Sequence, residues 1–148
     1  MVSLRAAARN PLPTIFLGLV LLSGCGSPRC QPNGGEAMEI FDLYFGRSVA
    51  GRAEVSDREW RDFREQVITT ALPNGYTVLD GVGSWMNPRT RATITEQTKI
   101  LEVALPEAPA NLALINRIRR AYQQRFHQYA IGMTVRSGCG SFSPAEAP

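Results

Sequence analysis

The chain is poor in the side chains that build most metal and nucleophilic sites. Of its 148 residues, three are cysteine and one, His127, is histidine. No Cys-x-x-Cys pair occurs, so this set does not predict a zinc or copper site. A nucleophile needs a neighbouring base, and the lone imidazole falls near the end of a predicted helix, where a surface role is the ordinary one. We therefore nominate no catalytic residue, no metal ligand and no cofactor.

An apolar run long enough to cross a bilayer is also missing, because a span needs roughly 20 apolar residues. The stretch Thr14–Leu22 is shorter, and it stands between two arginines and the sequence Leu22-Ser23-Gly24-Cys25. A positive start, a short apolar stretch and small residues before a cysteine are typical of a bacterial lipoprotein signal. We predict a signal peptide over residues 1–24 and a diacylglyceryl group on Cys25. The alternative is an ordinary secretory signal followed by a chance cysteine.

Acyl chains on Cys25 give a stable membrane anchor, since each buried CH₂ contributes roughly 0.8 kcal/mol. The next residue is Gly26 and not aspartate. By resemblance to Gram-negative lipoproteins, this favours the outer membrane over retention in the inner membrane. We thus expect a lipid-anchored protein of the cell envelope that faces the periplasm.

Basic residues are in small excess, and part of that excess belongs to the signal. The whole chain has 16 Lys and Arg against 13 Asp and Glu, so removal of Arg5 and Arg9 leaves 14 against 13. A net charge this close to zero argues against a nucleic-acid partner.

The rest of the chain has the length of one domain, which we place at residues 38–142. Before it, residues 25–37 are rich in Gly, Pro and Asn and form a tether; after it, residues 143–148 form a loose tail. Apolar alternation predicts strands over 38–45, 76–85, 93–105 and 129–136.

Two helices separate these strands. The first begins with a capping box, Ser56-Asp57-Arg58-Glu59, and ends near Pro73. The second presents one apolar stripe: Leu112, Ile115, Ile118, Tyr122 and Phe126.

The element order β-α-β-β-α-β predicts an α+β fold of the ferredoxin-like split type, with a four-stranded antiparallel sheet and two helices on one face. Its strands would lie in the order 4-1-3-2. Another α+β sandwich with the same element order is the alternative.

This strand order places the start of the first strand beside the end of the last. Cys30 lies shortly before the first strand and Cys139 just after the last. In an oxidising compartment, two such cysteines are more often bridged than free, so we predict a Cys30–Cys139 disulfide. The alternative is a pair of reduced thiols.

Several motifs resemble those of one bacterial family, catalogued as domain of unknown function 3574. The match runs in order from about Glu39 to Phe142. It departs from the family pattern at Ser84, before a tryptophan, and at Gly140. The resemblance implies a compact α+β domain and no catalytic residues. The motifs that carry it are Leu43-Tyr44-Phe45-Gly46-Arg47-Ser48, Val55-Ser56-Asp57 with Glu59-Trp60, Thr77-Val78-Leu79-Asp80-Gly81 with Gly83 and Trp85, Glu96 with Lys99, Ala121-Tyr122 with Arg125-Phe126, and Cys139 with Ser141-Phe142.

The predicted topology gathers three loops at the end of the domain opposite the tether: the loop after the first strand, the hairpin and the turn around the histidine. Four arginines fall there, with Glu54 as the nearby acid, and they are candidates to contact an anionic ligand, a glycan or an envelope protein. Solvated loop arginines are the alternative. These candidates are Arg47, Arg52, Arg89 and Arg91.

Two further residues are candidate contacts. Asp80 stands beside Gly81 and Gly83, which leave room for a ligand, although an acid bonded to nearby backbone is the ordinary interpretation. Trp85, at a strand end, is a candidate aromatic platform. The first strand is apolar on both faces, and this predicts an open sheet face that a second copy or a partner covers.

We therefore expect a non-enzymatic interaction or binding module of the envelope. The alternative is a cofactor-independent enzyme with a pocket on the open sheet face that uses Asp80 or another strand carboxylate. A flat, wet sheet face favours the first hypothesis; a concave apolar pocket with a buried carboxylate favours the second.

Overall fold

The computed structural model describes residue 30 and residues 35–142. The predicted signal peptide, Cys25, most of the tether and the tail 143–148 lie outside the described residues. Within the part of the chain that is described, no helix has the length and apolarity needed to cross a membrane.

Four strands and two helical segments follow one another in the predicted order. The strands are β1 (Glu36–Gly46), β2 (Thr77–Met86), β3 (Thr93–Pro106) and β4 (Gly132–Gly140). The first helical segment consists of α1 (Asp57–Phe63), a π-helical stretch (Arg64–Ile68) and α2 (Thr69–Ala71), and the second is α3 (Asn111–Phe126).

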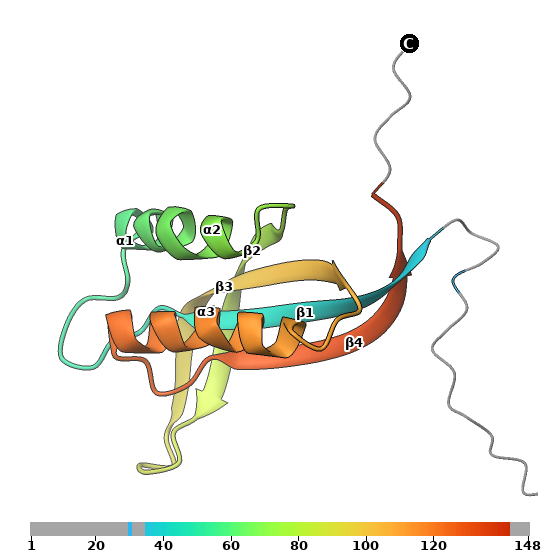
Figure 1. The fold of residues 1–148 in the computed structure, drawn as a ribbon. Helices are drawn as coiled ribbons and strands as arrows, with labels where there is room; N and C mark the ends of the chain where they lie inside the picture. The colour runs from blue at the N-terminus through green and yellow to red at the C-terminus, as the bar shows by residue number, and fades with distance from the viewer. Residues whose placement is uncertain (1–29, 31–34, 143–148) are drawn as a thin grey trace, which may run out of the picture.

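The strands form one antiparallel sheet in the order β2-β3-β1-β4 (Figure 1). This is the order predicted from the sequence, and the α+β class is confirmed. Central β1 pairs with β3 through Leu43↔Leu101 and with β4 through Leu43↔Met133.

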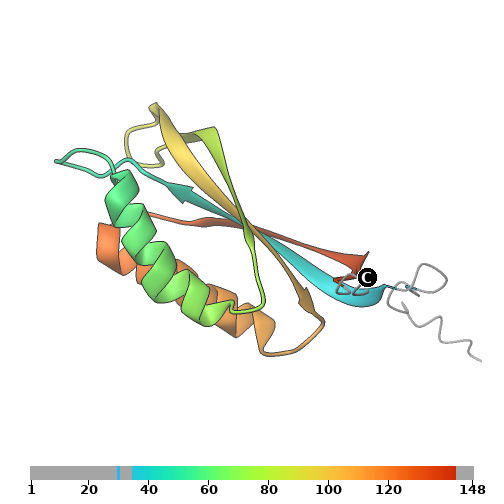
Figure 2. The ribbon, with the colours of Figure 1, turned by 90° about the horizontal axis from the view of Figure 1, so that it is seen from above.

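Both helical segments cover the same face of the sheet (Figure 2). The ring of Phe45 on β1 lies 5.3 Å from Trp60 of α1 and 4.8 Å from Tyr122 of α3, measured between ring centroids. Phe41 and Leu43 point to the same side, because alternate residues of a strand share a face, and both are buried. The core therefore lies between the helices and this one face.

The first helix starts where its capping box predicts. The Ser56 hydroxyl accepts a hydrogen bond from the Glu59 backbone N–H, and the Glu59 carboxylate accepts from the Ser56 backbone N–H at 2.8 Å. The hydrogen bonds that this carboxylate accepts, first from the Ser56 N–H and then from the Ser56 hydroxyl, lower the pKa of Glu59. Val55, just before the cap, is buried.

The predicted stripe of the second helix holds except at its first member. Leu112 is 51% exposed, whereas Ile115, Ile118 and Tyr122 are buried. The reason is that the first turn of α3 points Asn111 inward, where its side-chain amide donates to the Glu39 carboxylate at 2.6 Å.

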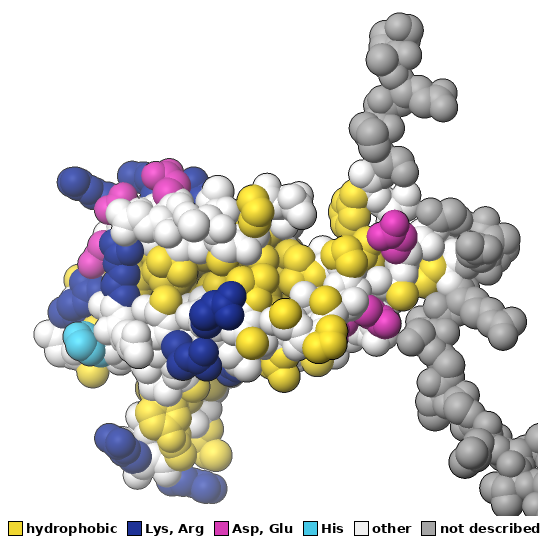
Figure 3. Space-filling model, in the orientation of Figure 1, with side chains coloured by type: hydrophobic (Ala, Val, Ile, Leu, Met, Phe, Trp, Pro, Cys, Tyr) yellow, Lys and Arg dark blue, Asp and Glu magenta, His cyan; other side chains and the backbone are white. Residues whose placement is uncertain are grey.

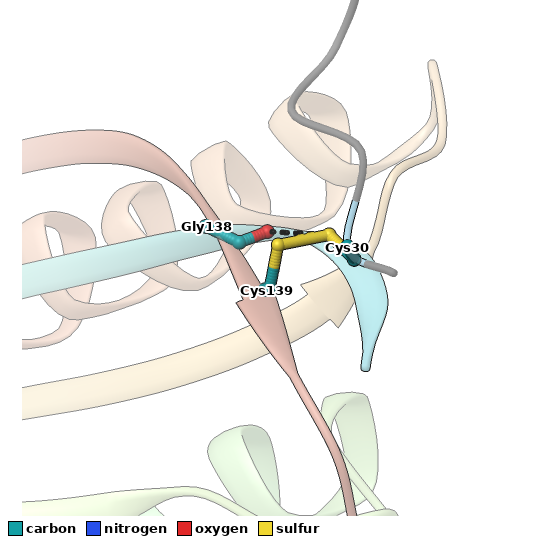
Figure 4. The surroundings of a disulfide bond; sticks show 3 residues. All are labelled: Cys30, Gly138 and Cys139. Atoms are coloured by element: carbon teal, nitrogen blue, oxygen red, sulfur yellow. Dashed lines mark hydrogen bonds between the residues drawn. A yellow bond between two sulfur atoms is a disulfide. The ribbon is translucent and has the colours of Figure 1, made fainter. Parts of the chain in front are cut away.

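The predicted disulfide is confirmed: Cys30 and Cys139 are bonded, with their Cα atoms 5.4 Å apart (Figure 4). The Cys30 sulfur also lies 3.9 Å from the carbonyl oxygen of Gly138, a packing contact, since a bridged sulfur has no hydrogen to donate. Cys139 lies within β4 and not after it. The strand is longer than predicted because its glycine-rich end keeps pairing with the start of β1, as in Ala37↔Cys139.

Among the residues that the structure describes, no helix lies over the other face of the sheet. Every glycine of the edge strands β2 and β4 falls on this face by alternation, and side chains of the central strands lie over several of them. For example, the ring of Tyr44 lies against Gly132. At mid-sheet, Arg136 forms ion pairs with Asp42 and Glu102. A second copy over this face stays a prediction.

Candidate functional site

Three loops meet at the end of the domain opposite the disulfide. The Gln128 side chain, in the turn after α3, donates to the carbonyl oxygen of Ser48, in the loop after β1, at 2.8 Å. The ring of Tyr129, in the same turn, lies parallel to that of Trp85, beside the β2–β3 hairpin, with 6.1 Å between centroids. The loop after β1, the hairpin and the turn after α3 therefore lie together, as predicted.

Two of the four candidate arginines in this region have structural partners. Arg47 is only 9% exposed; its Nε donates to the Val55 carbonyl at 2.6 Å, and its guanidinium pairs with Glu54 and Asp57. Arg52 pairs with Glu59 at 3.0 Å. These contacts fasten the loop to the start of α1.

The other two arginines stand on the hairpin turn and are exposed. Asn87 builds this turn, since its side-chain oxygen accepts from the Arg89 backbone N–H at 2.9 Å and its carbonyl from the Arg91 N–H at 2.8 Å. Figure 3 shows Lys and Arg side chains at the hairpin tip and around the ends of the helices, with apolar side chains between. Of the four candidate arginines, two are thus engaged in ion pairs within the loop and two are exposed on the hairpin turn.

Asp80 is placed on the helix-side face of β2 and pairs with Lys99 on β3. Its side chain is 77% exposed. Gly81 and Gly83 belong to the opposite, open face of the strand by alternation. The space that their missing side chains leave is therefore not beside the Asp80 carboxylate.

A pocket of about 780 Å³ lies where the open sheet face meets the three loops. We call it the Glu96 pocket. Its sheet-side lining includes Tyr44, Gly46, Trp85, Ile94, Glu96 and Thr98, and residues 48–50 and 127–130 close its sides.

Glu96 is held in this pocket by two hydrogen bonds from different elements. Its Oε1 accepts from the indole Nε1 of Trp85 at 2.7 Å, and its Oε2 accepts from the backbone N–H of Ser48 at 2.8 Å. The carboxylate lies in the space that a side chain at Gly46 would occupy. Glycine is therefore required at that position for Glu96 to adopt this orientation.

Beneath the pocket, the Tyr122 hydroxyl donates to the carbonyl oxygen of Gly46 at 3.1 Å. Burial raises the pKa of Tyr122, so it stays a neutral donor. This hydrogen bond fixes the end of β1 from the core side, while Glu96 packs against it from the other.

Aromatic side chains give the pocket its apolar surface. The rings of Trp85 and Tyr129 are parallel within 8°, and Tyr129 is 62% exposed. Tyr44 lines the pocket from β1 and is partly exposed. These three aromatic side chains therefore line the pocket together.

Glu96 is the one carboxylate among the described residues that line this pocket; His127 also lines it, and no arginine or lysine is among them. A carboxylate beside aromatic rings can accept a proton or a hydrogen bond, or balance a positive charge. Within the described residues, no group of three or more His, Cys, Asp or Glu is arranged to hold a metal ion.

A second pocket, of about 720 Å³, lies near the disulfide end. Leu72, Leu105, Leu114 and Phe142 are among its lining residues, together with Glu102, which is already paired with Arg136. It offers apolar surface but no comparable fixed carboxylate.

Sequence reasoning found part of the site. Trp85 was a candidate contact, and the structure places it in the pocket wall, with its N–H bonded to Glu96. Glu96 was one of several strand carboxylates with nothing to single it out. Tyr129 and the Ser48 N–H were missed, because their roles depend on how distant loops meet.

No curated protein matches the chain. Solved structures share its fold at low sequence identity, two chains of phage SAM lyase among them. A phage SAM lyase in complex with S-methyl-5'-thioadenosine has a TM-score of 0.55 at 10% identity, over 75% of this chain and 95% of that one. The apo state of a phage SAM lyase has a TM-score of 0.50 at 10% identity, over 75% and 94%.

The sequence model of one family matches residues 41–142, which include all four strands except the start of β1, both helical segments and the Glu96 pocket. This chain therefore belongs to the family described as protein of unknown function DUF3574.

Proposed function

We propose that this protein is a lipid-anchored binding module of the cell envelope that takes a small organic molecule into the Glu96 pocket. The observation that carries the proposal is the Glu96 carboxylate, fixed between Trp85 and the Ser48 N–H in a pocket with aromatic walls. Small-molecule sites combine such apolar surfaces with a few fixed polar groups, and their usual volumes are about 300–1,000 Å³.

The place of the pocket agrees with an anchor at Cys25. The disulfide joins Cys30 to the end of β4, beside the start of β1, and the pocket lies at the far end of that strand. Eleven residues of strand span about 35 Å. A chain anchored just before Cys30 would thus hold its pocket away from the outer membrane, towards the periplasm.

The finer fold assignment is also an inference. The order β2-β3-β1-β4, with both helical segments on one face, supports the ferredoxin-like split β-α-β-β-α-β arrangement.

Fluorescence tests ligand binding directly. The chain has two tryptophans, and Trp60 is buried in the core. We expect members of a fragment library to change the emission of the purified protein, and the change to be lost in Trp85→Phe. Glu102→Gln, which removes a carboxylate outside this pocket, is the matched control. If no fragment perturbs Trp85, the pocket is not a binding site.

Metabolic labelling with palmitate tests the anchor separately. We expect label on the wild-type protein and none on Cys25→Ala, which should leave the membrane fraction. Equal labelling of both proteins would contradict lipidation at Cys25.

A cofactor-independent enzyme is the second candidate, and the carboxylate of Glu96, which lines the pocket, favours it as a general base. The fold is shared with a phage SAM lyase, so S-adenosylmethionine is a reasonable first substrate to assay. Chromatography of S-adenosylmethionine incubated with the wild type and with Glu96→Gln tests this. Equal decomposition rates in both, matching the protein-free rate, would exclude that substrate.

A further inference from the structure

We propose that the ligand of the Glu96 pocket is an organic cation with a methylated onium head, a quaternary ammonium or a sulfonium group. This inference rests on the proposed binding function and adds the chemical class of the ligand. It follows from the charge, the aromatic surfaces and the remaining hydrogen-bonding capacity of the pocket.

The Glu96 carboxylate brings a negative charge to the pocket. Both hydrogen-bond partners of Glu96, the Trp85 indole and the Ser48 amide, are neutral N–H donors. They satisfy an ionised carboxylate without cancelling its charge. Arg47, which precedes Ser48 in the loop, is already paired with Glu54 and Asp57. A ligand that brings a positive charge is therefore favoured here, and an anionic ligand is disfavoured.

The pocket also has an aromatic surface. A cation over the face of a Trp or Tyr ring is attracted by the negative face of the π system, and the attraction grows when water is excluded. Trp85, Tyr129 and Tyr44 all line the pocket that holds the Glu96 carboxylate, and the Trp85 N–H is bonded to it. Aromatic faces with a nearby acid are the usual surroundings for quaternary ammonium groups in proteins.

The hydrogen-bonding capacity left in the pocket favours a methylated onium group over a primary ammonium or a metal ion. Other cations need more oxygen acceptors. A primary ammonium carries three N–H donors and is strongly hydrated, and a calcium ion takes six to eight oxygen ligands. The pocket offers a single carboxylate with one donor already bound to each oxygen. A methylated onium has no N–H to satisfy and is weakly hydrated, so it needs only ring faces and one compensating charge.

The pocket is also larger than such a head group. Its volume of about 780 Å³ leaves room for the rest of an organic molecule between the hairpin and the turn after α3. The head group is expected beside Glu96 and the remainder towards the loops.

Two matched probe pairs test the proposal by calorimetric or NMR titration of the purified full-length chain. Choline and 3,3-dimethylbutan-1-ol have the same shape and differ in charge; S-adenosylmethionine and S-adenosylhomocysteine compare a sulfonium with a neutral thioether. We expect the charged member of at least one pair to bind at least about tenfold tighter. The pair that shows the preference identifies the onium. Equal binding within both pairs, or no onium binding, overturns the proposal.

Variants localise the effect. We expect Glu96→Gln to weaken onium binding at least about tenfold and to leave the neutral isostere unchanged, with Glu102→Gln as the control. Should Glu96→Gln unfold, Tyr129→Leu serves instead, because Tyr129 is largely exposed; Phe142→Leu, at the other pocket, is its control. Unchanged onium affinity in the folded variants also overturns the proposal.

The two levels of inference fail in different ways. If neutral fragments perturb Trp85 but no onium is preferred, the protein binds small molecules and the ligand class is wrong. If no probe of any charge perturbs Trp85, the binding function itself is wrong.

Discussion

The indole Nε1 of Trp85 donates a hydrogen bond to Oε1 of Glu96 across 2.7 Å, between the adjacent strands β2 and β3. Trp has one N–H, and once it is committed to the carboxylate the orientation of the ring is set. The same ring is parallel to that of Tyr129. One hydrogen bond therefore orients both the charge and the aromatic surface of the pocket.

Replacing Trp85 with Phe should loosen the carboxylate while keeping an aromatic ring. A typical hydrogen bond contributes about 1 kcal/mol to stability, so we expect thermal unfolding to show a loss of that order. Because a ligand must then hold a carboxylate that is no longer fixed, we expect roughly fivefold weaker binding by calorimetry. Trp85→Leu, which also removes the ring, should weaken binding further. Equal affinities of wild type and Trp85→Phe would show that this hydrogen bond does not organise the pocket.

A methyl group at Gly46 should displace Glu96 from its position. The Cβ of an alanine would overlap the carboxylate, while the backbone at Gly46 does not have a positive φ. We expect Gly46→Ala to lose most of the ligand affinity in a titration.

Gly81→Ala is the matched control for that variant. It adds a methyl group on the same sheet face, 3.2 Å from the terminal methyl group of the Ile100 side chain. It should keep the affinity of the wild type, and a comparable loss in both variants would point to general damage of the sheet.

Features that depend on neighbouring residues in the sequence could be predicted, and so could the order of the strands. Local patterns, such as the capping box at Ser56 and the alternation along β1, predicted the elements correctly. The element order then predicted the strand order, and with the oxidising compartment that an export signal implies it predicted the disulfide.

Side-chain partners across loops could not be predicted in this way. Arg47 looked like a surface cation, but the ladder continues past Gly46, with the Arg47 N–H bonded to the Gln97 carbonyl at 3.0 Å, and this turns its side chain under the loop. Glu96 was indistinguishable from other strand acids, because the space it fills is created by a glycine on another strand.

Reducing the disulfide should lower stability without altering the pocket. The bridge joins residues 109 apart in sequence, and the chain-entropy model gives a contribution of about 4–5 kcal/mol for a loop of this size. Denaturant unfolding of wild type and of Cys30→Ser/Cys139→Ser measures it. Ligand affinity of the folded double variant should match the wild type, because the pocket lies at the opposite end; a change of under 1 kcal/mol would contradict the entropic account.

The hydroxyl of Tyr122 should make stability depend on alkaline pH. Its hydrogen bond to the Gly46 carbonyl is buried, so Tyr122→Phe should cost about 1 kcal/mol near neutral pH. Burial raises the pKa of Tyr122 above its usual value of 10.0, so the unfolded chain loses the phenolic proton first as pH rises. The wild type therefore holds the full contribution below pH 10.0 and loses it above.

The size of this loss follows from proton linkage. While the folded tyrosine stays protonated, stability falls by up to about 1.4 kcal/mol per pH unit, so the advantage of wild type over Tyr122→Phe should vanish near pH ~11. Urea unfolding of both proteins from about pH 7 to about pH 11 gives the difference directly, because the other titrating groups are common to both. A gap that stays constant over this range would mean that the Tyr122 hydroxyl ionises equally easily in the folded and unfolded chains, and that the end of β1 beneath Glu96 is open to water.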